Sequence, residues 1–145
     1  MNKRTFILAL LAAAWLGTVG SVAHADEAVK AVYHFTQGVE EAARGLNNIR
    51  NHLDADPTAK IVVVANGKAG VQFILEDAVD HNGKPFAERI SALANRGVEF
   101  RVCNNTLTAF QIPKEKLALE AKIVPSGVAE VARLQAKEGY AYFRP

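Results

Sequence analysis

Apolar side chains follow two alternating patterns along the chain from residue 30 onward. The β-rich run 30–36 (Lys-Ala-Val-Tyr-His-Phe-Thr) predicts a strand, and the segment 38–54 that follows repeats its apolar residues every three or four positions. The repeated positions are Val39, Ala42, Ala43, Leu46, Ile49 and Leu53. This spacing gathers them on one face of an α-helix, so the pattern predicts a strand followed by an amphipathic helix.

The run 61–65 (Ile-Val-Val-Val-Ala) is apolar without interruption. Such a run is typical of a strand that is covered on both faces, as in a parallel sheet. Residues 66–70 then predict a turn, 71–79 have helical character, and 81–85 predict a second turn. The pattern therefore predicts that the chain repeats the strand-to-helix arrangement.

The second half of the chain continues this alternation. A helix is predicted over 86–94, ended by Gly97, and a strand over 98–103. The N-cap types Asn104, Asn105 and Thr106 then precede a predicted helix over 107–110, which is followed by a short helix over 113–119 and a strand over 121–124. The last predicted elements are a helix over 127–138, capped by Ser126 and ended by Gly139, and a strand over 140–143. In the helix 127–138 the repeated positions are Val128, Val131, Ala132 and Gln135. Alternation with short connections predicts a three-layer α/β domain with a mostly parallel sheet of about five strands.

The N-terminal residues have the organisation of a cleavable signal peptide. Lys3 and Arg4 precede an uncharged, mostly apolar run over 6–19, and the small-residue motif Ala-His-Ala follows at 23–25. The run of about 14 residues rises only about 21 Å as a helix, which is short of the roughly 30 Å core of a bilayer. We therefore expect residues 1–25 to be removed, a single domain over 26–145, a periplasmic location and no membrane segment after cleavage.

Cleavage changes the charge balance. Lys3 and Arg4 are two of the 17 basic residues, and all 15 acidic residues lie after residue 25, so the remaining chain has equal numbers of each. The precursor's excess of positive charge therefore gives no argument for binding nucleic acid or an anionic membrane. Cys103 is the only cysteine, which excludes an internal disulfide.

Polar residues follow three of the predicted strands. In open α/β sheets, sites form beyond the carboxyl ends of the strands. These ends carry Thr36, the pair Asn66 and Gly67, and the run Cys103, Asn104, Asn105 and Thr106. Cys103 is the one strong nucleophile, and its place before a helix start favours the thiolate. A buried structural cysteine is the alternative, because free cysteines are often packed in cores.

Other chemistries find little support in the sequence. His34, His52 and His81 have no metal-ligand spacing with Cys103 or with one another, so we expect no metal site. The chain has neither a dinucleotide fingerprint nor a phosphate-binding loop, and we expect no cofactor. In the strand 30–36, His34 is interpreted as a packed or surface residue. A catalytic pair of Cys103 with a histidine that the fold brings close to it is an alternative that the sequence leaves open.

Four segments together resemble the DsrE/DsrF-like family of small α/β proteins. They are the strand and turn 61–67, the segment Val-Glu-Phe-Arg-Val-Cys-Asn-Asn-Thr-Leu at 98–107, the segment 124–128, and the ending over 134–142 with Gly-Tyr-Ala-Tyr. The resemblance implies a flavodoxin-like fold and assembly into homo-oligomers, as trimers or hexamers. In sulfur-relay members a single cysteine accepts sulfur as a persulfide and passes it to a partner, and Cys103 stands at that position.

Two hypotheses follow. In the first, the protein is a periplasmic sulfur carrier, similar to a sulfurtransferase, that takes sulfur onto Cys103 from a donor and transfers it to an acceptor protein. Asn104, Asn105 and Thr106, with Asn66, Gly67 and Thr36, form the surrounding pocket. A lone thiol suits this role, because no second cysteine collapses the persulfide into a disulfide. In the second, the protein is a non-enzymatic oligomeric binding module in which Cys103 is only packed.

Overall fold

A computed structural model of the protein describes residues 27–145. Five strands form one sheet in the order β4-β3-β2-β1-β5, and every neighbouring pair is parallel. The strands are β1 (Lys30–Phe35), β2 (Lys60–Ala65), β3 (Glu99–Cys103), β4 (Ala121–Val124) and β5 (Ala141–Phe143). The parallel α/β sheet expected from the sequence is confirmed. The predicted signal peptide, residues 1–25, and its cleavage point lie outside the described residues.

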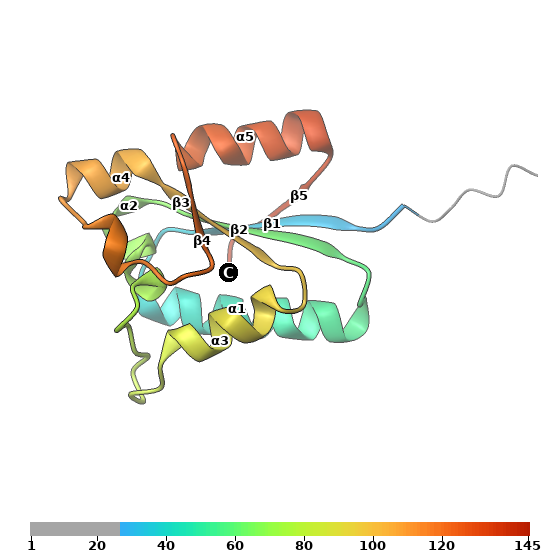
Figure 1. Cartoon of the computed structure of the whole chain (residues 1–145). Coiled ribbons are helices and arrows are strands. Elements are labelled where there is room, and N and C mark those ends of the chain that lie inside the picture. The colour runs from blue at the N-terminus through green and yellow to red at the C-terminus, as the bar shows by residue number, and fades with distance from the viewer. Residues whose placement is uncertain (1–26) are drawn as a thin grey trace, which may run out of the picture.

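Helices cover both faces of the sheet and complete three layers. They are α1 (Val39–Ala55), α2 (Gly67–Gly70), α3 (Phe86–Ala94), α4 (Asn104–Ala109) and α5 (Gly127–Glu138), with 3₁₀ turns η1 (Gln72–Ile74) and η2 (Lys114–Lys116). Figure 1 shows α1 and α3 below the sheet and α5 above it. The chain steps from β1 to β4 in one direction and returns past three strands to β5. Because crossovers are right-handed, this reversal moves α5 to the opposite face.

The face under α1 and α3 holds the larger apolar core. Alternate residues of β1, namely Ala31, Tyr33 and Phe35, point into it and are buried. Phe35 packs against Phe73 with ring centroids 5.0 Å apart, and Phe73 packs against Phe86 at 6.0 Å. These rings join the sheet, η1 and α3 into one cluster, so this face supplies most of the apolar burial.

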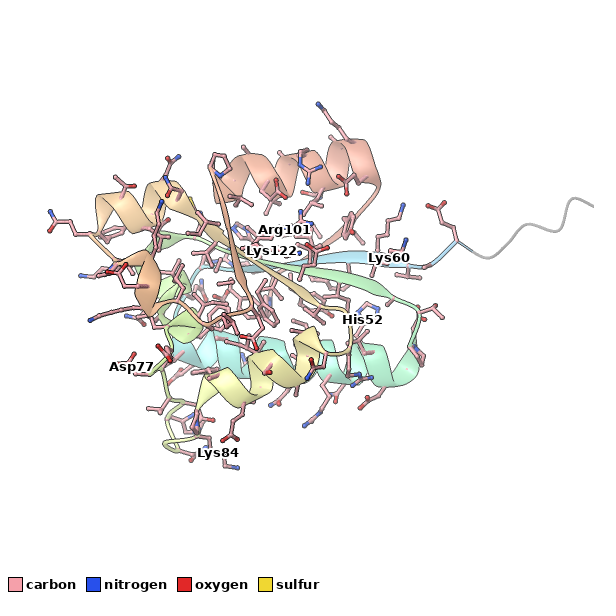
Figure 2. The ribbon with its side chains drawn as sticks, viewed as in Figure 1. His52, Lys60, Asp77, Lys84, Arg101 and Lys122 are labelled. Atoms are coloured by element: carbon pink, nitrogen blue, oxygen red, sulfur yellow. The ribbon has the colours of Figure 1, made fainter. Side chains whose placement is uncertain are left out.

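The face under α5 has a smaller core and more charge. Its buried apolar cluster consists of Val32, Val62, Val64, Val131 and Leu134. Beside it, Arg101 on β3 forms ion pairs with Glu99 and with Glu130 of α5, and Lys122 on β4 also pairs with Glu99 (Figure 2 labels Arg101 and Lys122). This face therefore combines a short apolar strip with a charged network.

Two predicted helices are wrong in extent. Of the segment 71–79 only Gln72–Ile74 is helical, as a 3₁₀ turn, and of 113–119 only Lys114–Lys116 is. The two segments instead pair with each other. Glu76 N–H donates to Lys116 O at 2.8 Å, and Ala118 N–H donates to Ile74 O at 2.8 Å. These bonds between segments about 40 residues apart satisfy the backbone in place of helical bonds.

The apolar stripe predicted for the last helix is also partly wrong. Val131 is buried as expected, but Val128 is 63% exposed, and the other buried positions of α5 are Gly127 and Leu134. The helix ends are as predicted: Ser126 Oγ accepts from Ala129 N–H, and Gly139 has the left-handed conformation at φ 73°. The residues 66–70, predicted as a turn, include the single helical turn α2.

Candidate functional site

Cys103 lies where β3 ends and α4 begins. It is the last residue of the strand and the N-cap residue of the helix, with an extended backbone at φ −70° and ψ 114°. The junction predicted from the sequence is therefore present, but Asn104, Asn105 and Thr106 form the first turn of α4 and do not precede it. Cys103 is only 5% exposed. Its sulfur faces backbone groups that the start of a helix leaves unpaired.

The start of α5 also lies against Cys103. A Cβ atom added to the buried Gly127 would come within 2.9 Å of Asn66 Cβ and 3.2 Å of Cys103 Cβ. Only a residue without a side chain allows this approach. The loop before α5 is also tied to α4, because Asn105 N–H donates to Pro125 O at 3.3 Å. Two helix starts therefore converge on Cys103.

The surroundings of Cys103 favour its thiolate. Burial raises the pKa of the thiol, because it disfavours the charged form. The nearby N–H groups of Gly127, Thr106 and Asn105 and the hydroxyl of Thr106 act in the opposite direction, because their positive ends stabilise the charged sulfur. Together they bring the pKa of Cys103 below its ordinary value. Low exposure and a stabilised thiolate coexist because the donors replace water.

Thr106 links the ends of β2 and β3. Its hydroxyl oxygen accepts a hydrogen bond from Gly67 N–H at 3.0 Å. Since that oxygen accepts from Gly67, the hydroxyl proton is left to point toward the Cys103 sulfur. Thr106 is buried and Gly67 directly follows β2, so the sheet edge fixes this donor in place.

A histidine that the sequence left as a packed or surface residue joins this edge of the sheet. His34 Nε2 lies 2.5 Å from Asn66 Oδ1, and His34 Nδ1 lies 3.0 Å from Tyr142 Oη. Because the amide oxygen only accepts, Nε2 carries the proton in this arrangement, and Nδ1 accepts from the tyrosine. Asn66 in turn contacts Gly127 at the start of α5. The signal for His34 was its alternation with Val32, which places it on the α5 face of β1.

The remaining predicted residues take different positions. The side chain of Asn105 is exposed, and its contribution comes from the backbone. The amide oxygen Oδ1 of Asn104 is buried and has no hydrogen-bond partner among residues 27–145. Thr36 takes part in another contact, since its N–H donates to Glu41 Oε2 at 2.6 Å at the start of α1. The cluster at Cys103 thus contains Asn66, Gly67, Asn105 and Thr106.

Two further properties concern the part of the chain that the structure describes. Within it, no three side chains of histidine, cysteine, aspartate or glutamate lie close enough together to bind a metal ion. None of its helices has the length and apolar character that crossing a membrane requires.

Five parallel strands with helices on both faces make this a three-layer α/β protein. Its one thiol lies at the carboxyl end of β3, an inner strand of the sheet. Comparison with known families identifies it further. The family model described as "DsrE/DsrF-like family" matches residues 3–145, so the chain belongs to that family.

Solved structures agree with this assignment. A protein of unknown function from Methanobacterium thermoautotrophicum, MTH1491, is 30% identical, with a TM-score of 0.71, over 81% of this chain and 99% of its own. The ychN protein from E. coli shares the fold at 12% identity, with a TM-score of 0.61, over 79% of this chain and 99% of its own. No curated protein matches the chain.

Proposed function

We propose that the protein is a sulfur carrier, similar to a sulfurtransferase, that holds sulfur as a persulfide on Cys103. One observation carries the proposal. Cys103 lies at the starts of α4 and α5, where the nearby N–H groups of Gly127, Asn105 and Thr106 and the Thr106 hydroxyl bring its pKa below the ordinary value. The thiolate is the nucleophilic form of cysteine, so these donors favour the reactive state.

The transfer needs no cofactor. The Cys103 thiolate attacks the outer sulfur of a polysulfide or of a donor persulfide. A new S–S bond forms at Cys103 as the donor's S–S bond breaks, and the leaving thiolate or shortened polysulfide carries away the electron pair. The resulting terminal sulfur anion is held by the same donors. An acceptor thiolate then repeats the exchange and restores Cys103, so no net oxidant or reductant is consumed.

The low exposure of Cys103 limits the size of the sulfur donor that can reach it. A side chain that is 5% exposed is poorly accessible to a bulky disulfide. Small anionic donors such as polysulfide or thiosulfate suit it better; with thiosulfate, sulfite is the leaving group. The lone cysteine also suits the role, because no second thiol of the same chain competes for the bound sulfur.

The setting proposed for this carrier is the periplasm, after removal of residues 1–25. We also propose that it works as a homo-oligomer and exchanges sulfur with a donor or acceptor protein. Exposed apolar side chains support contacts of this kind. They include Leu119 at 97%, Val128 at 63% and Phe110 at 47% exposure, and the last two belong to the start of α5 and the end of α4.

Mass spectrometry of the intact protein tests the carrier function. The folded protein is incubated anaerobically with polysulfide or thiosulfate, next to a Cys103→Ser variant. We expect a gain of about 32 Da per sulfur in the wild type, reversed by a thiol acceptor, and no gain in the variant. No adduct with any donor would contradict the carrier function and would favour a binding module with a packed cysteine.

A further inference from the structure

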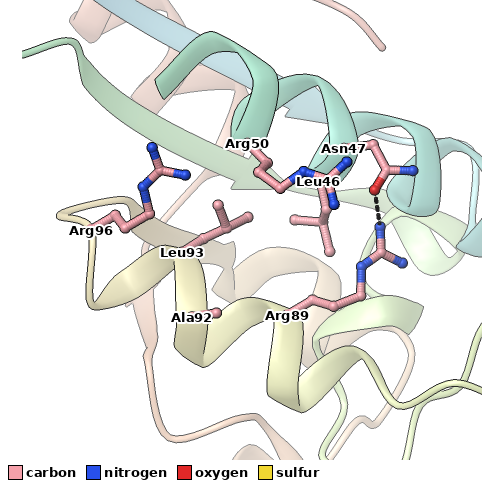
Figure 3. A pocket seen from close by; sticks show the side chains of 7 residues that line it. All are labelled: Leu46, Asn47, Arg50, Arg89, Ala92, Leu93 and Arg96. Carbon is pink, nitrogen blue, oxygen red and sulfur yellow. Dashed lines mark hydrogen bonds between the residues drawn. The ribbon is translucent and has the colours of Figure 1, made fainter. Parts of the chain in front are cut away.

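A pocket between α1 and α3 lies on the face of the sheet opposite α5 and Cys103. It has a volume of about 220 Å³. Its walls are Leu46, Asn47 and Arg50 on α1, and Arg89, Ala92, Leu93 and Arg96 on and just after α3. Figure 3 shows the guanidinium groups around an apolar floor. Three arginines and no acidic residue form its lining.

The arrangement follows from helical spacing. Arg89, Ala92 and Arg96 stand at i, i+3 and i+7, so they share one side of α3 and its C-terminal extension. Leu46 and Arg50 stand at i and i+4 on the facing side of α1. The leucines close the floor, and both are nearly fully buried. An arginine thus stands at each end of the α3 wall, and a third stands across from them.

Arg89 is held in position before any ligand arrives. Its Nη2 donates to Ala43 O at 2.7 Å and to Asn47 Oδ1 at 3.2 Å. Its guanidinium lies over the Phe86 ring at 5.4 Å and 3.7 Å from Asp80 Oδ2. A guanidinium that is already held on several sides loses little conformational entropy when it binds an anion, because the fold has ordered it beforehand.

Arg50 and Arg96 differ in their partners. Arg96 pairs with Asp54 at 2.8 Å through Nη1. Arg50 has no hydrogen-bond or ion-pair partner among residues 27–145. A guanidinium has five N–H donors, so donors of all three arginines remain available. The pocket therefore offers one free cation beside two that are only partly engaged.

We infer that this pocket binds a small organic anion, whose carboxylate, sulfonate or phosphate group contacts Arg50 and whose short apolar body rests on Leu46, Ala92 and Leu93. Guanidinium groups match such oxoanions bidentately. The volume favours a small ligand, because pockets for drug-sized molecules start at about 300 Å³. The site is separate from Cys103 and does not depend on the sulfur-carrier function.

Phenyl phosphate is a suitable probe, with inorganic phosphate and phenol as its two halves. Binding is followed at low salt by amide shifts in NMR spectra of the folded domain and by calorimetry. We expect phenyl phosphate to shift residues around Arg50 and Leu93 and to bind about tenfold or more tightly than either half. Equal binding of inorganic phosphate would overturn the role of the apolar floor.

Variants of exposed residues separate the contribution of the Arg50 charge from that of the apolar floor. Arg50→Gln is expected to weaken phenyl phosphate binding about tenfold or more, since it removes a charge-assisted bond. Arg44→Gln is the matched control, because it removes the same charge from α1 outside this pocket, and it should change binding less than about twofold. Ala92→Leu fills the floor and should weaken phenyl phosphate but not inorganic phosphate. Equal effects of Arg50→Gln and Arg44→Gln would overturn the site.

Discussion

The two faces of the sheet differ in what they contain. Under α1 and α3, aromatic and aliphatic side chains form the larger cluster, with Phe35, Phe73 and Phe86 in mutual contact. Under α5 the buried apolar cluster is small, and charged side chains and the buried Cys103 lie on the same face of the sheet. One face therefore supplies most of the apolar burial, while the other positions charged groups and the thiol.

Local sequence explains this asymmetry. Alternation in β3 sends Phe100 and Val102 to the larger core and Glu99, Arg101 and Cys103 to the α5 face. Among residues 27–145, α5 is the helix that packs on that face, where it contacts β1, β2 and β3. Its start has to come close to the ends of β2 and β3, which Gly127 permits. The polar edge is therefore a consequence of how α5 is placed.

The largest expected effect is on the apolar face. Phe35→Ala should lower the free energy of unfolding by about 3–5 kcal/mol, because it leaves a cavity between Phe73 and α1. Leu134→Ala on the α5 side should cost less, about 2–3 kcal/mol, since its cluster is smaller. Urea unfolding followed by circular dichroism measures both. An equal or larger loss for Leu134→Ala would refute the division between the faces.

Gly127→Ala should perturb the site and stability together. The new Cβ would come 2.9 Å from Asn66 Cβ, so the start of α5 has to move. We expect a loss of about 1–3 kcal/mol and a higher pKa of Cys103, because the Gly127 N–H moves away from the sulfur. Val128→Ala, at the exposed next position, is the control. A Cys103 pKa unchanged by Gly127→Ala would mean that α5 does not stabilise the thiolate.

Thr106→Val should act mainly on the site. It keeps the shape of the side chain but removes the hydroxyl that accepts from Gly67 N–H and donates to Cys103. We expect a stability loss of about 1 kcal/mol and a higher pKa of Cys103. Thr108→Val, on the exposed side of α4, should leave both unchanged. Parallel measurement of thiol reactivity against pH separates the two variants.

The pH dependence of stability gives the smallest effect. A thiol whose pKa is lower in the folded protein stabilises the fold above its unfolded pKa, about 8.5, and this contribution is lost as the pH falls through the folded pKa. The stability of the wild type relative to Cys103→Ser should therefore increase with pH across this window. Urea midpoints measured over a pH series check it. A difference that is flat or falls with pH would contradict the assignment.

Much of the fold could be predicted from local patterns. The strand run 61–65, the helical repeat in 38–54 and the capping residues Ser126 and Gly139 each carry their own signal, and the structure has these elements. The segment 71–79 differs from the predicted helix because its backbone pairs with the distant residues 116 and 118. A tertiary contact of this kind does not alter the local hydrophobic repeat, so the repeat alone cannot predict it.

The candidate site was only partly accessible to sequence reasoning. Cys103 was recognisable from its chemistry and from its place between a strand and a helix. The approach of Gly127 and the bond between His34 and Asn66 depend on how α5 and β1 meet at the sheet edge. Thr36 follows β1, which β2 separates from β3, and its N–H donates to Glu41. Ends of adjacent strands come close, while the loops that follow them diverge.

The most direct test of the account is the alkylation rate of Cys103 in the folded protein as a function of pH. Because this is the only thiol in the chain, the measured rate belongs to one site. A stabilised thiolate at Cys103 predicts a midpoint below that of an ordinary thiol, about 8.5, and a shift upward in Thr106→Val. A midpoint at or above the ordinary value in the wild type would contradict it and would leave Cys103 as a packed residue.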